Sequence, residues 1–207
     1  LAMRPQAVLW SSLEDAHALH ALRPGWTRCQ AGQSWVWDGV LFEVLHPPVS
    51  GATSRSRKPN ETSCVLRISQ GAVSALLAGD IEAAQELALV RAGLAPVDVL
   101  LVPHHGSGGS SSAPWVAAVA PRLAVVSAGH RNRFGHPRQE VVQRWQAQGA
   151  EVLATADSGA IRVWLGAQGL QLREQRIHAA RWWDAAGRAR SAAILSPIEQ
   201  AAVGPEG

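Results

Sequence analysis

The chain has 207 residues, of which 47% are hydrophobic and 17% are charged. These proportions are typical of one globular domain and exclude a disordered chain, and no apolar run approaches the roughly 20 residues that cross a bilayer. The formal net charge is +3, and Lys58 is the sole lysine. Arginine binds phosphate with two parallel hydrogen bonds, which suits an anionic partner; the alternative is the codon bias of a GC-rich genome.

Apolar patterning predicts strands and hairpins first, then alternating strands and helices. Asp38-Gly39 is a strong hairpin-turn signal, and the Pro- and Ser-rich segment 46–62 predicts a surface loop. Strands are predicted over Gln6–Trp10, Ser34–Trp37, Val40–Leu45, Ser63–Ser69, Val73–Ala78, Val97–Val102, Leu123–Ser127, Glu151–Ala154, Ala160–Leu165 and Leu170–Glu174. Helices are predicted after Ser11 or Ser12 and over Ile81–Ala92, Ser110–Val119, Arg138–Gln148 and Ile177–Ala186. This order indicates one compact α/β unit whose last two strands close the sheet.

The two cysteines, Cys29 and Cys64, lie far apart and form no CxxC pair, so they cannot make a zinc site alone. A disulfide would require an oxidising compartment. We expect instead two buried thiols in neighbouring strands.

The first candidate site residue is Asp80, which follows Gly79 at the end of a predicted strand. A carboxylate at the mouth of a buried strand suits a metal ligand, and the glycine lets other groups approach closely. The alternative is a helix N-cap, because a predicted helix begins at the next residue.

The second candidate is the segment Val102-Pro103-His104-His105-Gly106-Ser107, directly after an apolar strand. Imidazole is a ligand for zinc, manganese or iron and a proton carrier near neutral pH. The following Gly/Ser stretch leads into a helix start, where free N–H groups favour phosphate oxygens, so Ser107 is a candidate substrate contact. The alternative is a purely structural turn.

The third candidate is the loop Gly129–Pro137, which follows the next predicted strand. His136 would complete a ligand set, while Arg131, Asn132 and Arg133 would hold an anionic substrate. The alternative is a solvated turn. Jointly, the aspartate and histidines of the three loops occur at corresponding ends of successive strands, where ligands gather in α/β sheets. They make a credible transition-metal shell that is incomplete for two metals.

These motifs together resemble the ComEC-type metallo-β-lactamase domain, from about residue 6 to 165. They are Asn60-x-x-Ser63-Cys64-Val65-Leu66, Leu77-Ala78-Gly79-Asp80, Val102-Pro103-His104-His105-Gly106-Ser107 and Asn132-x-x-Gly135-His136-Pro137. The resemblance implies an α/β fold, an αββα sandwich, over residues 1–174, followed by an Ala- and Arg-rich tail over 175–207. It also implies two divalent metal ions, zinc or manganese, with Asp80, His104 and His136 as ligands.

Members of this family open with a His-x-Asp-x-Asp-His motif, which this chain does not contain. The nearest histidines, His17 and His20, lack the paired aspartates. We expect that Leu1 falls just downstream of that motif. The chain would then lack the N-terminal strands and the first metal motif, and would bind metal weakly alone.

The resemblance implies a DNA-uptake protein of natural transformation in the bacterial inner membrane, with this domain on the extracytoplasmic side. Its partners would be single-stranded DNA, the membrane-channel portion of the same polypeptide and other competence proteins. Two metal ions would activate a water for attack on a phosphodiester, and His104 or His105 would protonate the leaving oxygen. The basic loop with Arg55 and Lys58 would steer backbone phosphates or only add solubility. The alternatives are a small-molecule hydrolase of the same fold and a metal-free DNA-guiding module.

Overall fold

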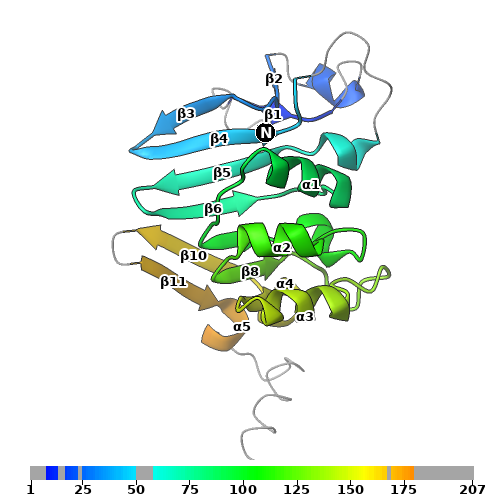
Figure 1. Cartoon of the computed structure of the whole chain (residues 1–207), viewed down its shortest axis with the longest axis vertical. Coiled ribbons are helices and arrows are strands. Elements are labelled where there is room, and N and C mark those ends of the chain that lie inside the picture. Colours follow the sequence, from blue (N-terminus) through cyan, green and yellow to red (C-terminus); the bar gives the residue numbers. More distant parts are fainter. Residues whose placement is uncertain (1–7, 14–16, 23–24, 50–57, 167–168, 180–207) are drawn as a thin grey trace, which may run out of the picture.

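The computed structural model describes residues 8–13, 17–22, 25–49, 58–166 and 169–179. Within them, one mixed sheet has the strand order β3-β4-β5-β6-β7-β8-β9 (Figure 1). Its strands are β3 (Ser34–Trp37), β4 (Val40–His46), β5 (Val65–Gln70), β6 (Val73–Leu77), β7 (Val99–Leu101), β8 (Leu123–Val126) and β9 (Glu151–Ala154). The strands from β3 to β6 are antiparallel and those from β6 to β9 are parallel. The predicted α/β class is therefore confirmed.

One face of this sheet is covered by the helices α1 (Ala83–Arg91), α2 (Ala113–Val119) and α3 (Gln139–Ala147). Side chains alternate across a strand, so the cross-strand neighbours Leu76, Leu100 and Ala124 share this face. They form one buried cluster with Trp115 and Trp145 from the helices. The predicted β-α-β part of the chain is confirmed, including the burial of the apolar run around β7.

The other face is covered in part by a hairpin of β10 (Ile161–Gly166) and β11 (Gly169–Glu174). The side chains on the inner face of this hairpin are Val163, Leu165, Leu170 and Leu172. They pack against Ala75, Val99 and Leu123 of the main sheet. We expected these strands to close the main sheet, which is wrong, because they form a separate two-stranded sheet. Their alternating burial suits a layer with one buried and one open face.

The N-terminal part forms the short parallel pair β1 (Trp10–Ser11) and β2 (Thr27–Arg28) and the 3-10 helix η1 (Ala18–Leu22). The predicted strand 6–10 overlaps β1 only at Trp10, and its residues 6 and 7 lie outside the described residues. The Trp10 and Trp35 ring centroids are 4.7 Å apart, and those of Trp35 and Phe42 are 5.1 Å apart. Aromatic contacts thus join β1 to the β3–β4 hairpin.

A disulfide joins Cys29 and Cys64, with 5.8 Å between their Cα atoms. The expectation of two free thiols was wrong. Cys29 follows β2 and Cys64 precedes β5, so the bond ties the small N-terminal sheet to the main sheet. Residues 35 apart in sequence meet here only through the tertiary fold.

The predicted helices begin too early because the residues before them act as caps. Glu82 is the N-cap of α1 and forms a capping box with Gln85, and Ser112 precedes α2. The sequence did not predict three short helices: η2 (Pro59–Thr62), η3 (Pro103–Gly106) and α4 (Thr155–Ser158). A further short helix, α5 (Gln175–His178), was predicted in part. α5 overlaps the predicted helix 177–186, whose residues from 180 on lie outside the described part. None of the helices in the described ranges has the length and apolarity to cross a bilayer.

Glu86 of α1 is a fully buried carboxylate that joins the three helices. Its two side-chain oxygens accept hydrogen bonds from the backbone N–H groups of Ser111 and Ser112, just ahead of α2. From α3, Arg144 donates to the Ser111 carbonyl and the Trp145 indole donates to the Ser111 hydroxyl. This network fixes the end of the loop that follows β7.

Glu86→Ala is expected to lower the free energy of unfolding by about 2–4 kcal/mol, because two buried N–H groups lose their acceptor. Urea unfolding measures the change. The matched control is Glu140→Ala, which removes an exposed carboxylate from the first turn of α3 and should change stability by less than about 0.5 kcal/mol. Equal losses in the two variants would contradict the capping role.

Candidate metal centre

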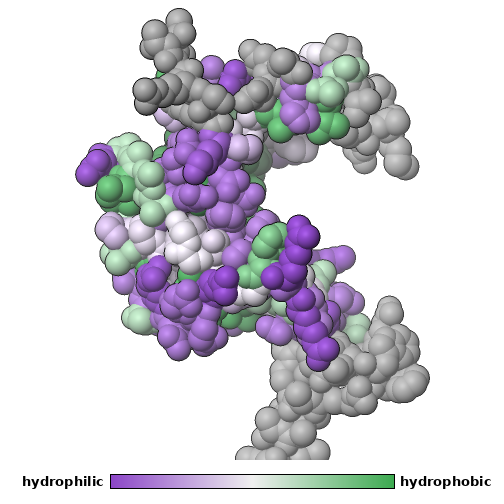
Figure 2. All heavy atoms as spheres, turned by 90° about the vertical axis from the view of Figure 1, so that its right-hand side faces the viewer, coloured by the Kyte–Doolittle hydropathy of each residue, from purple (hydrophilic) through white to green (hydrophobic). Residues whose placement is uncertain are grey.

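The candidate residues lie at one edge of the main sheet, where the parallel strands β6, β7 and β8 end (Figure 1). Asp80 follows β6, His104 and His105 follow β7, and His136 lies in the loop after β8. Figure 2 looks onto this end of the molecule, where hydrophilic side chains gather over the middle and the outline is hollowed on one side. The predicted location of the candidates at successive strand ends is confirmed.

Gly79 lets the turn after β6 pack against the residues before β5. Its φ is +61°, and a Cβ there would lie 3.0 Å from the Ser63 Cβ and 3.2 Å from the Cys64 carbonyl oxygen. Glycine alone suits this close approach. The backbone N–H of Asp80 donates to the Ser63 hydroxyl at 3.1 Å, so the strand end that carries the carboxylate is held in place.

His104 and His105 both have left-handed backbone conformations, with φ of 50° and 55°. This region is unfavourable for residues other than glycine, and such strain concentrates at functional sites. The backbone N–H of His104 donates to the Gly79 carbonyl at 2.9 Å, which joins the loops after β6 and β7. The tight turn sends the two imidazoles toward different partners.

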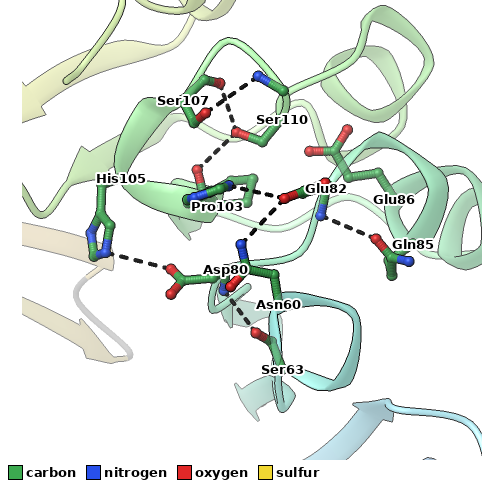
Figure 3. A network of polar contacts seen from close by, with 12 residues as sticks. Asn60, Ser63, Asp80, Glu82, Gln85, Glu86, Pro103, His105, Ser107 and Ser110 are labelled. Atoms are coloured by element: carbon green, nitrogen blue, oxygen red, sulfur yellow. Dashed lines mark hydrogen bonds and ion pairs between the residues drawn. The ribbon is translucent and has the colours of Figure 1, made fainter. Parts of the chain in front are cut away.

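The His105 imidazole points toward the Asp80 carboxylate (Figure 3). Its Nδ1 is 2.8 Å from the Ser127 carbonyl oxygen, and its Nε2 is 3.5 Å from Oδ1 of Asp80. Because a carbonyl only accepts, Nδ1 carries a hydrogen, and the lone pair of the neutral ring is then on Nε2. Two acceptors therefore face each other, an arrangement that suits a proton or a metal cation between them.

The His104 and His136 rings form a second pair, with centroids 6.2 Å apart. The Nδ1 atom of each ring is buried and has no hydrogen-bond partner. Burial lowers the pKa of His136 below its ordinary value, and the charges of Arg138, His104 and His105 lower it further. His136 is therefore neutral at pH 7, the form that binds metals.

Gly106 brings the loops after β7 and β8 into contact. Its φ is +79°, and a Cβ at this position would lie 2.7 Å from the Cβ of Pro137. The Gly106 carbonyl accepts a hydrogen bond of 2.9 Å from the backbone N–H of Arg138. A side chain at Gly106 would separate His136 from the two preceding histidines.

Sequence reasoning missed Glu82 as a member of this cluster. Its Oε1 lies 3.8 Å from Nδ1 of His104 and accepts a hydrogen bond of 3.2 Å from the Asn60 amide (Figure 3). The available signal was a second carboxylate two residues after Asp80, and the presence of Asn60 in the motif that begins the resemblance. Neither signal pointed clearly to the site, because Glu82 is also the N-cap of α1.

The described part of the chain also contains other residues predicted to bind substrate. The Asn132 amide bonds the backbone of Gly129 and His136 within its own loop, while Arg131 is exposed with φ 51°. The Ser107 hydroxyl accepts from the Gly109 N–H at 3.4 Å. Lys58 is exposed ahead of η2, and Arg55 lies outside the described residues.

The donor chemistry fits part of a divalent-cation site. Carboxylate oxygen and neutral imidazole nitrogen suit zinc and manganese, and the pair of Asp80 and His105 presents both. Among the described residues, however, no three His, Cys, Asp or Glu side chains converge on one point. The expected set of Asp80 with His104 and His136 is split, since Asp80 faces His105 and the other two histidines face each other. A complete shell requires further ligands.

No family model matches the chain. Among curated proteins, it is 38% identical over 154 residues to Competence protein ComA of Neisseria gonorrhoeae, covering 73% of this chain and 22% of that protein. It is 35% identical to Recombination protein 2 of Haemophilus influenzae, a match that covers 76% of this chain and 19% of that protein. It is 37% identical to ComE operon protein 3 of Bacillus subtilis, a match that covers 59% of this chain and 16% of that protein. The chain thus spans about a fifth of the length of the curated relatives it matches.

Proposed function

Since the chain is a domain of the ComEC type, we propose that it is the metal-dependent hydrolase part of a DNA-uptake protein and acts on phosphodiesters of incoming single-stranded DNA. The observation that carries this proposal is the Asp80–His105 pair, in which a carboxylate oxygen faces an imidazole nitrogen whose tautomer is set by Ser127. The names of the relatives, with their references to competence and recombination, support the DNA substrate.

In the complete domain, we expect an αββα sandwich in which upstream strands extend the layer begun by β10 and β11. Asp80 and His105 would hold one divalent cation, and His104 and His136 would face a second. Such cations, zinc or manganese, supply an activated water and neutralise phosphate charge. The neutral state of His136 supports its role as a ligand, and so does the lack of a hydrogen bond, within the described residues, to Nδ1 of His104 and of His136.

The other roles are assigned to the chain's own side chains. Glu82, which accepts a hydrogen bond from Asn60, would orient His104. The imidazole of His104 or His105 would protonate the leaving oxygen. The exposed guanidinium of Arg131 would bind a substrate phosphate, with Ser107, Lys58 and Arg55 as further contacts.

We place the domain on the extracytoplasmic side of the bacterial inner membrane. The Cys29–Cys64 disulfide supports this side, because disulfides persist in oxidising compartments and are rare in the cytosol. Single-stranded DNA, the channel portion of the same polypeptide and other competence proteins would be its partners.

The test uses an upstream-extended chain, defined as this chain joined to a segment with the His-x-Asp-x-Asp-His motif. Replacing both His104 and His105 with alanine should reduce cleavage of a labelled single strand at least about a hundredfold, because a proton donor and a metal ligand are lost together. Circular dichroism checks the fold. The control replaces the exposed His17 and His130 and should cleave normally. Unchanged cleavage in the first variant would reject the histidine roles.

A further inference from the structure

The outward face of the β10–β11 hairpin carries two arginines and a tryptophan that the proposed hydrolase site does not use. Arg162 and Arg173 are directly opposite each other in the antiparallel register, and Trp164 is opposite Gln171. Because the inner positions Val163 and Leu172 pack on the main sheet, alternation places this set on the other face. We name Arg162, Arg173 and Trp164 the hairpin surface.

Two like charges directly opposite each other destabilise a sheet. In the part of the chain that the structure describes, no hydrogen bond or ion pair joins either guanidinium to an acidic side chain, and Nε of Arg173 is buried without a hydrogen-bond partner. The strand pair thus carries a concentrated positive charge without an internal counter-ion. An external anion bound across both guanidiniums would offset the repulsion.

Trp164 adds an apolar plane beside this charge. Its side chain is 47% exposed although it is large and hydrophobic, and it lies about 7 Å along the strand from Arg162. Aromatic rings beside a basic track are the combination that holds single-stranded nucleic acid, since bases stack on the ring while cations bind the phosphates. A duplex, whose bases are already stacked, would use only the arginines.

The hairpin surface begins at the edge of the sheet that carries the candidate metal centre. The Thr155 hydroxyl bonds both the N–H and the carbonyl of Ala128, at 2.9 Å each, and Ala128 follows Ser127, the partner of His105. β10 starts at Ile161, shortly after Thr155. The ends of the hairpin that bear Arg162 and Arg173 are therefore tied to the site through one short helix (Figure 1).

We propose that the hairpin surface binds single-stranded DNA, with Arg162 and Arg173 on the phosphates and a base stacked on Trp164. This inference rests on the proposed function for its substrate class and adds the surface that holds the strand. It concerns binding without cleavage, so it is tested separately from the metal centre.

The test measures fluorescence anisotropy of a labelled oligothymidylate of about 15 nucleotides with the full chain in EDTA, where no cleavage occurs. Arg162→Gln with Arg173→Gln should weaken binding at least about tenfold at roughly 0.1 M salt, and should reduce the slope of log affinity against log salt by about 1.4, or 0.7 for each lost phosphate contact. Trp164→Leu should weaken binding about tenfold without changing that slope. Trp164→Phe should retain most of the affinity because it keeps an aromatic plane.

The matched control is Arg91→Gln with Arg122→Gln, which removes two exposed arginines elsewhere. An equal loss in this control would show that only net charge matters and would overturn the proposal. Full affinity in Trp164→Leu, or equal sensitivity of a duplex to that change, would also overturn it. Binding that survives in a chain without metal or cleavage activity supports the hairpin surface even if the hydrolase proposal fails.

Discussion

Asp80→Asn is expected to abolish divalent-cation binding by the upstream-extended chain and to lower phosphodiester cleavage by about a thousandfold or more, the order seen when one member of a catalytic unit is lost. Asparagine keeps the shape of the side chain and removes its charge. Nε2 of His105, 3.5 Å from Oδ1 of Asp80, would then face a neutral amide. Elemental analysis of the dialysed protein measures the bound metal, and a labelled single strand measures cleavage.

The control for this variant is Asp38→Asn in the turn between β3 and β4. Asp38 is exposed and has φ 49°, a conformation that asparagine adopts readily. The control therefore removes the same charge with little strain and should retain metal and activity. Metal content that is unchanged in Asp80→Asn would reject Asp80 as a ligand, and metal-free protein that still binds DNA would favour the DNA-guiding module.

The second large effect concerns the disulfide. Replacing Cys29 and Cys64 together with alanine is expected to lower the free energy of unfolding by about 3–4 kcal/mol, because the bond closes a segment of 35 residues and restricts the unfolded chain. Urea unfolding gives the loss. The unaltered chain in reductant should unfold like the variant, whereas the variant should be insensitive to reductant. Equal stability of the unaltered chain with and without reductant would show that the bond does not contribute.

The sheet edge that carries the site could be predicted because its signals are local. Apolar runs end at Asp80 and at His104, and parallel neighbouring strands bring such ends together. The close approach at Gly79 was also readable, since a glycine before a site residue indicates backbone contact. The order of strands and helices from β6 to β9 followed from the spacing of apolar residues alone, which differs between strands and helices.

The direction of each imidazole could not be predicted, because it depends on backbone conformation. Consecutive left-handed residues turn His105 toward Asp80 and His104 toward His136, and spacing carries no such information. The tautomer of His105 depends on the Ser127 carbonyl, which any residue type would provide.

Two larger features depended on tertiary structure. The pattern of β10 and β11 indicates a strand with one buried face, but not which layer it joins. Likewise, the two sulfurs meet because the fold brings the residue after β2 to the residue before β5, and no spacing rule gives this contact. These features required the assembled fold.

The disulfide also has a topological consequence. The covalent ring between Cys29 and Cys64 contains the whole β3–β4 hairpin. A single break in the backbone inside this ring opens the polypeptide without releasing either piece, so the edge of the sheet stays tethered to β5 through the sulfurs. Reduction of the disulfide then removes the last covalent link between the piece that carries Cys29 and the piece that carries Cys64.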